Sequence, residues 1–157
     1  FSSYPGLTFL CLACCGLTAL PEDLSHSTCI LEYLDLHGNK IANLPYSIAG
    51  LSYMKELNLS GNALVDSAMI ALAASFMAST QLRHLFLANN LITERGALTL
   101  SRGLSTKYNS LRLLVLTGNN VKDDGCAAIL ASVAIVHPHT AGQSHQAASP
   151  CRSLLSR

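Results

Sequence analysis

Apolar residues recur along this chain with a fixed spacing inside short blocks and a variable spacing between them. Each block has apolar residues at positions one, four, six and eleven, and an asparagine or a cysteine at position nine. Five blocks fill all five positions, and they start at residues 7, 31, 54, 82 and 111. Chance placement of leucine would not produce five complete matches, so we interpret the chain as a series of internal repeats.

The apolar residues at positions four and six of each block alternate in the manner of a short β-strand with one buried face. One such strand cannot bury its leucines alone, so we expect neighbouring repeats to stack them into a continuous core. At position nine the chain turns out of the strand, and an asparagine there can satisfy backbone groups that would otherwise stay unpaired. A cysteine bonds more weakly, which fits a terminal repeat. We assign this structural role to Cys15, Asn39, Asn62, Asn90 and Asn119.

The segments between the strands differ in length, because the blocks follow one another at steps of 24, 23, 28 and 29 residues. After the first two blocks the chain reads Leu20-Pro21 and Leu44-Pro45, and these proline-interrupted segments are too short for a full helix. The later segments carry apolar or small residues four apart, which is helical spacing. The spacing predicts amphipathic helices over residues 64–76, 92–104 and 121–133, with Val133 on the buried face of the last.

The template L-x-x-L-x-L-x-x-N/C-x-L resembles that of leucine-rich repeat proteins, over about residues 4–136. The first two repeats resemble the short LxxLP intracellular type and the later ones the ribonuclease-inhibitor-like type. The resemblance implies an α/β solenoid: a short right-handed horseshoe with about five parallel strands on its concave face and helices or irregular segments on its convex face. We expect this domain to occupy residues 1–136. The small polar residues of the tail, 137–157, predict disorder.

The resemblance also implies that the chain is no enzyme, needs no cofactor and binds another protein through the concave face. The variable strand residues point to that face, and in its middle they combine aromatic with polar groups, as protein interfaces do. Ordinary solvated positions are the alternative interpretation, since single surface aromatics are common. The candidate partner-binding residues are Tyr33, Asp35, His37, Glu56, Asn58, His84 and Phe86.

Other kinds of site have weaker support. Asp35, His37 and His84 could approach one another as a metal or catalytic group, but an open sheet face has no enclosed pocket. No phosphate-binding or dinucleotide-binding glycine motif occurs, so we expect no small-molecule substrate. An array that serves only as a spacer is a further alternative.

A regulator of small GTPases is the second functional hypothesis, because some proteins of the ribonuclease-inhibitor subfamily activate such enzymes. Arg83, Arg95 and Arg112 are the candidate arginines, although no motif distinguishes any of them.

Composition narrows the class of partner. The chain has 29 leucines among 157 residues, 12% charged residues and a net charge of +1. This balance gives no sign of nucleic-acid binding. No run of about 20 apolar residues occurs, so we expect no membrane span.

The cellular compartment is predicted from the cysteines and the N-terminal residues. Residues 7–20 are uncharged and could form the apolar region of a secretory signal, but no basic residue precedes them and they fit the repeat template. The six cysteines lack a paired CxxC pattern, so we expect small, buried or half-buried thiols and a reducing, intracellular location. Neither terminus resembles a cap, so we also expect a piece of a longer array.

Overall fold

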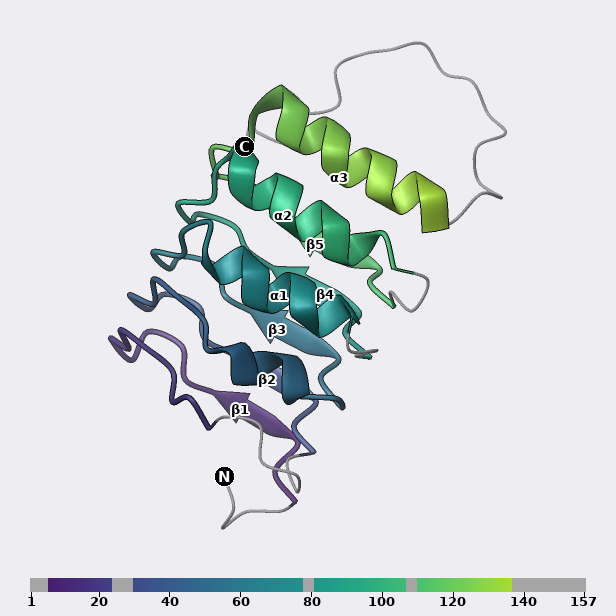
Figure 1. Cartoon of the computed structure of the whole chain (residues 1–157). Helices are drawn as coiled ribbons and strands as arrows, with labels where there is room; N and C mark the ends of the chain where they lie inside the picture. The colour runs from purple at the N-terminus through teal and green to yellow at the C-terminus, as the bar shows by residue number, and fades with distance from the viewer. Residues whose placement is uncertain (1–5, 24–29, 78–80, 107–109, 137–157) are drawn as a thin grey trace.

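Five short strands form one parallel sheet whose order follows the chain (Figure 1). The computed structural model describes residues 6–23, 30–77, 81–106 and 110–136, so the predicted tail lies outside the described residues. Each strand covers positions three to five of one predicted repeat, and the predicted parallel sheet is therefore confirmed. The strands are β1 (Phe9–Cys11), β2 (Tyr33–Asp35), β3 (Glu56–Asn58), β4 (His84–Phe86) and β5 (Leu113–Val115).

Equivalent residues of neighbouring repeats lie side by side across the sheet. The central leucines of the strands pair directly with one another, as do the residues before and after them. The backbone just before each strand reinforces this register: the carbonyl of Glu32 accepts from the N–H groups of Lys55, at 2.7 Å, and Glu56, at 3.0 Å. Because the register is the same between every pair of neighbouring strands, residues at the same repeat position form a column across the sheet.

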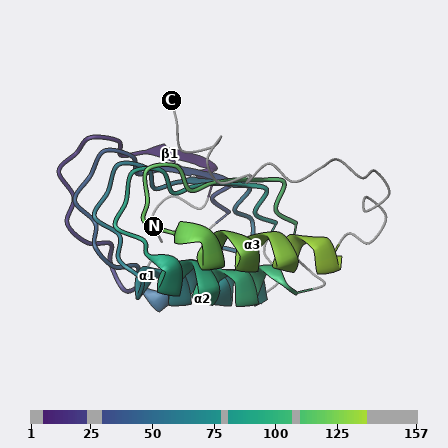
Figure 2. The same cartoon turned by 90° about the horizontal axis from the view of Figure 1, so that it is seen from above.

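The described helices between the strands lie on one side of the sheet (Figure 2). The second repeat has only a short 3-10 helix, η1 (Tyr46–Gly50), which begins directly after Pro45. The later, longer repeats form full α-helices that lie side by side: α1 (Ala68–Met77), α2 (Glu94–Leu104) and α3 (Lys122–Val136). The predicted difference from the helical segments is thus confirmed for the proline-interrupted segment of the second repeat, whereas that of the first repeat includes residues 24–29, which lie outside the described residues.

The core lies between the sheet and these helices. Leu34, Leu57 and Leu85 are buried from the sheet side, and Leu72 and Leu100 are buried from the helix side. The corresponding leucines of the first and fifth repeats are only partly buried, because each of these repeats has a described neighbour on one side alone.

One helix departs from the prediction. Val133 was expected on the buried face of α3, but it is 45% exposed, while Ser132 is 2% exposed. A residue turns about 100° around an α-helix, so steps of four drift steadily away from the buried face. In α2 the drift is tolerated because helices cover both of its flanks, whereas α3 has a described neighbour only on the α2 side.

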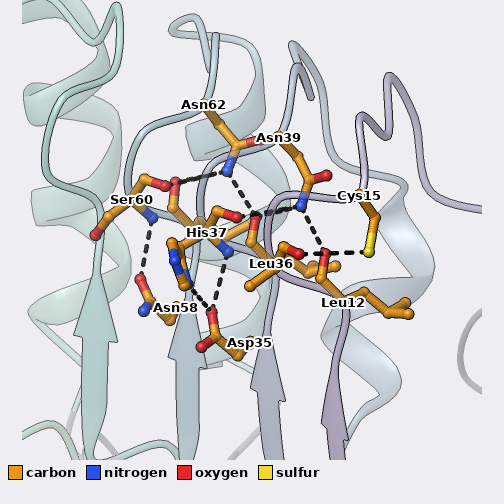
Figure 3. A network of polar contacts seen from close by, with 11 residues as sticks. Leu12, Cys15, Asp35, Leu36, His37, Asn39, Asn58, Ser60 and Asn62 are labelled. Carbon is orange, nitrogen blue, oxygen red and sulfur yellow. Dashed lines mark hydrogen bonds and ion pairs between the residues drawn. The ribbon is translucent and has the colours of Figure 1, made fainter.

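Asparagine side chains hold the turns that follow the strands (Figure 3). The Nδ2 group of Asn62 donates to the carbonyls of Leu36 and Leu59, both at 3.0 Å. Its Oδ1 accepts from the N–H of Ile41 at 3.1 Å. Each asparagine therefore joins its own turn to the preceding repeat. We call the set that makes these three bonds the asparagine ladder: Asn39, Asn62, Asn90 and Asn119.

Cys15 stands at the same position in the first repeat but makes a different contact. Its Sγ donates to the carbonyl of Ala13, two residues away, at 3.4 Å. This contact stays within one turn and joins no two repeats, as expected for a weaker hydrogen-bonding group.

The residue before the ladder, at position eight, adopts a left-handed backbone conformation in every repeat. Three of these residues are glycines, whereas Cys14 has a φ of 55° and Asn89 a φ of 53°. Both exceptions place their side chain over a glycine: a Cβ built on Gly38 would lie 2.6 Å from the Sγ of Cys14, and one on Gly118 would meet the Oδ1 of Asn89. A side chain at this position thus occupies the space that a glycine leaves open in the next repeat.

Candidate partner-binding surface

Figure 2 shows the sheet face that points away from the helices, and we call it the strand face. The register of the strands arranges the residues of this face in three columns. All seven candidate residues lie in these columns, and each is exposed or half-buried. The columns follow from the register of the sheet. They are Phe9, Tyr33, Glu56, His84 and Leu113 at position three; Cys11, Asp35, Asn58, Phe86 and Val115 at position five; and Ala13, His37, Ser60, Ala88 and Thr117 at position seven.

An aromatic pair lies at the β1–β2 end of the strand face. The rings of Phe9 and Tyr33 have their centroids 6.3 Å apart and are tilted by 38°, a geometry within the range of attractive aromatic contacts. Phe9 is 61% exposed and Tyr33 is 38% exposed. Phe9 was not among the candidate residues, although it stands in the same column as Tyr33. The sequence interpretation favoured the middle of the strip and therefore missed it.

Asp35 and Asn58, at the ends of two neighbouring strands, each accept a hydrogen bond from the backbone two residues later. The Oδ1 of Asp35 accepts from the N–H of His37 at 3.0 Å, and the Nδ1 of His37 lies 2.9 Å from the same oxygen. The Oδ1 of Asn58 accepts from the N–H of Ser60 at 3.1 Å (Figure 3). Within the described residues, the other carboxylate oxygen of Asp35 and the amide nitrogen of Asn58 have no bonding partner, so both are available to a ligand.

Glu56 and His84 form a contact between β3 and β4. The Oε2 of Glu56 lies 3.1 Å from the Nδ1 of His84. His84 is therefore paired with Glu56 and not with Asp35 or His37, which contact each other. The three residues considered as a metal site do not come together. Within the part of the chain that the structure describes, no group of three potential metal ligands comes together.

The two predicted aromatic anchors do not meet. Phe86 pairs in register with Asn58 on one side and Val115 on the other, in the position-five column. Tyr33 stands in the position-three column two strands away, where its aromatic neighbour is Phe9.

The thiols of the first repeat differ from the expectation. Cys11, Cys14 and Cys15 are free and exposed rather than half-buried. They stand at positions five, eight and nine, which face solvent in a repeat that has no described neighbour on its outer side. Cys126 is disulfide-bonded and so is not a thiol.

The arginines considered for GTPase regulation are divided between two regions. Arg83 and Arg112 are exposed and directly precede β4 and β5, one repeat apart. Arg95 is in the first turn of α2, among the helices that pack on the other side of the sheet. No described contact distinguishes any of the three, and GTPase regulation stays a prediction.

A pocket behind the sheet, between η1 and α1, is too small for a ligand. Its volume is about 10 Å³, room for about one water molecule. It is lined by Ile48, Leu51, Met54, Leu57, Leu72, Ser75 and Leu82.

Among the described helices, none has the length and apolar character needed to cross a membrane.

Comparison with known proteins identifies the family. One leucine-rich repeat family model matches residues 5–64, and a second matches residues 109–130. The chain is a leucine-rich repeat protein. Ribonuclease inhibitor from Mus musculus is 35% identical over 124 residues, which cover 75% of this chain and 27% of the inhibitor.

A solved structure shares the fold of this leucine-rich repeat protein. An internalin from Listeria monocytogenes superposes with a TM-score of 0.51 and 24% identity, over 69% of this chain and 27% of the internalin. The chain thus spans about a quarter of the length of each of these two relatives. Leucine-rich repeat proteins are in general protein-interaction modules.

Proposed function

We propose that this leucine-rich repeat protein is a non-catalytic module that binds another protein through its strand face. The observation that carries the proposal is the exposed pair of Phe9 and Tyr33, with Glu56 in the same column and Asp35 and Asn58 in the position-five column of the same face. Large aromatic anchors inside a polar surround are the usual core of a protein interface. The mouse relative, named as an inhibitor of a ribonuclease, supports the same kind of function.

The rigidity of the face supports this proposal further. The sheet register and the asparagine ladder hold the backbone of each strand at both of its ends. Binding then costs little ordering of the backbone, which favours affinity. The five strands form a strip roughly 20 Å wide, since neighbouring strands lie about 4.8 Å apart. An open strip of this size suits a protein surface better than a small molecule, which needs an enclosed pocket.

A capture experiment with matched variants tests the proposal. Immobilised wild-type protein would be compared with the strand-face variant Phe9→Ala/Tyr33→Ala and with the control variant Tyr46→Ala/Leu98→Ala. The control removes one exposed aromatic and one exposed aliphatic side chain from the segments on the other side of the sheet. We expect the wild type and the control to capture the same partner and the strand-face variant to lose it. Equal capture by all three proteins would refute the strand-face assignment.

A further inference from the structure

The column at position two carries an uneven distribution of charge. It stands just before the strands and consists of Thr8, Glu32, Lys55, Arg83 and Arg112. The backbone bonds that set the sheet register also hold this column in line. At its end, the carbonyl of Arg83 accepts from the N–H groups of Arg112, at 2.8 Å, and Leu113, at 3.0 Å.

Side chains in this column reach their neighbours. The Nζ of Lys55 lies 2.6 Å from the Oε2 of Glu32, one repeat away. By the same geometry, Arg83 stands between Lys55 and Arg112, and all three are cationic. Like charges on directly neighbouring strands are unfavourable. Because Glu32 already pairs with Lys55, the repulsion that remains is between Arg83 and Arg112, and a carboxylate bound between them would lower it.

The nearby carboxylates already have partners. Glu32 is paired with Lys55, and Glu56 lies against His84 in the next column. Within the described residues, neither Arg83 nor Arg112 has a carboxylate partner. Leu113, which directly follows Arg112 in the chain, is 43% exposed, so an exposed apolar residue stands at the start of the same strand.

We propose that Arg83 and Arg112 bind an acidic segment of the protein partner, with Leu113 supporting an apolar side chain of the same segment. The inference rests on the proposed function and adds the charge of the partner. Guanidinium groups bind carboxylates through paired, charge-assisted hydrogen bonds, and the long side chains of two arginines on neighbouring strands can each bind a carboxylate of one peptide segment. An apolar anchor beside such pairs is typical of the centre of an interface. A nucleic acid fits less well, because the chain has a net charge of only +1.

A defined peptide tests the charge of the partner. The probe is a capped peptide in which three glutamates stand on each side of one leucine, and the comparison peptide has glutamine in place of every glutamate. Isothermal titration at low salt would measure both against the wild type and Arg83→Gln/Arg112→Gln. The control, Arg95→Gln/Arg102→Gln, removes the same charge from exposed positions of α2, where the two residues are roughly 10 Å apart along the helix.

We expect the acidic peptide to bind the wild type and the control alike, and to bind Arg83→Gln/Arg112→Gln at least about tenfold more weakly. The glutamine peptide should bind at least about tenfold more weakly than the acidic one. No measurable binding of the acidic peptide, an equal loss in both arginine pairs, or tighter binding of a DNA duplex than of the peptide would each overturn the inference. The proposed function is tested separately, because the capture experiment changes Phe9 and Tyr33 and leaves both arginines in place.

Discussion

Replacing Asn90 tests the role of the asparagine ladder most directly, because this side chain is buried and sits between two complete repeats. Its Nδ2 group donates to the carbonyls of Leu59 and Leu87, both at 3.0 Å. Its Oδ1 accepts from the N–H of Leu64, also at 3.0 Å. The substitution Asn90→Ala removes these three bonds at once, together with a fourth from Nδ2 to the carbonyl of Ala88 at 3.2 Å.

The cost of this substitution follows from the partners that remain. The carbonyl of Leu59 keeps a bond from Asn62, and that of Leu87 keeps one from Asn119. The N–H of Leu64 is left without a partner among the described residues. An orphaned buried donor costs about 1–3 kcal/mol, and a lost hydrogen bond about 0.5–1.5 kcal/mol. We therefore expect Asn90→Ala to lower the free energy of unfolding by about 2–4 kcal/mol.

The isosteric variant Asn90→Asp separates the donor role of this side chain from its acceptor role. The aspartate keeps an acceptor for the N–H of Leu64 but turns a carboxylate oxygen toward two carbonyl oxygens. Because this arrangement is repulsive and buried, Asn90→Asp should be less stable than Asn90→Ala at neutral pH.

Urea denaturation followed by circular dichroism would measure these free energies. Asn120→Ala is the control, because Asn120 is exposed and its side chain makes no described hydrogen bond. We expect the control to stay within about 0.5 kcal/mol of the wild type. If Asn90→Asp proved as stable as the wild type, the ladder would not act by donating to the two carbonyls.

Three further substitutions test the packing in the same assay. Gly103→Ala should cost about 1–3 kcal/mol, because its Cβ would lie 2.7 Å from the Cα of Ala73 on α1; an unchanged stability would show that the two helices can separate freely. Cys14→Gly should stabilise the protein by about 0.5–1 kcal/mol by removing a side chain from a left-handed residue, and a loss of stability would contradict this. Phe76→Ala, in the buried face of α1, should cost about 3–5 kcal/mol; a loss below about 1 kcal/mol would mean that the core closes around the gap.

The sequence predicts the sheet well because the fold requires the same side chains at the same positions of every repeat. Leu34, Leu57 and Leu85 pair with one another and are buried, as the template implies. The helices are predicted less well at their ends. Val133 is exposed because its burial depends on a neighbouring helix, which the spacing within one repeat does not describe.

The strand face is predicted as a set of columns but not as a set of contacts. Each side chain has several neighbours within reach, and the register alone does not select among them. His84 could have approached His37 or Asp35, yet it lies against Glu56, which stands in the same column. Tyr33 has Phe9 as its aromatic neighbour rather than Phe86 for the same reason. The compartment likewise stays a prediction.

Side chains that stabilise the fold and side chains of the strand face stand at different positions of the repeat. This separation determines which positions tolerate substitution. A change on the strand face, as at Glu56, leaves the core and the ladder intact. Position eight is different, because Cys14 and Asn89 each lie over a glycine of the next repeat. A side chain there requires a glycine beside it, so changes at neighbouring repeats are coupled. The residues of the strand face have no such requirement, and their composition is therefore the better guide to the partner.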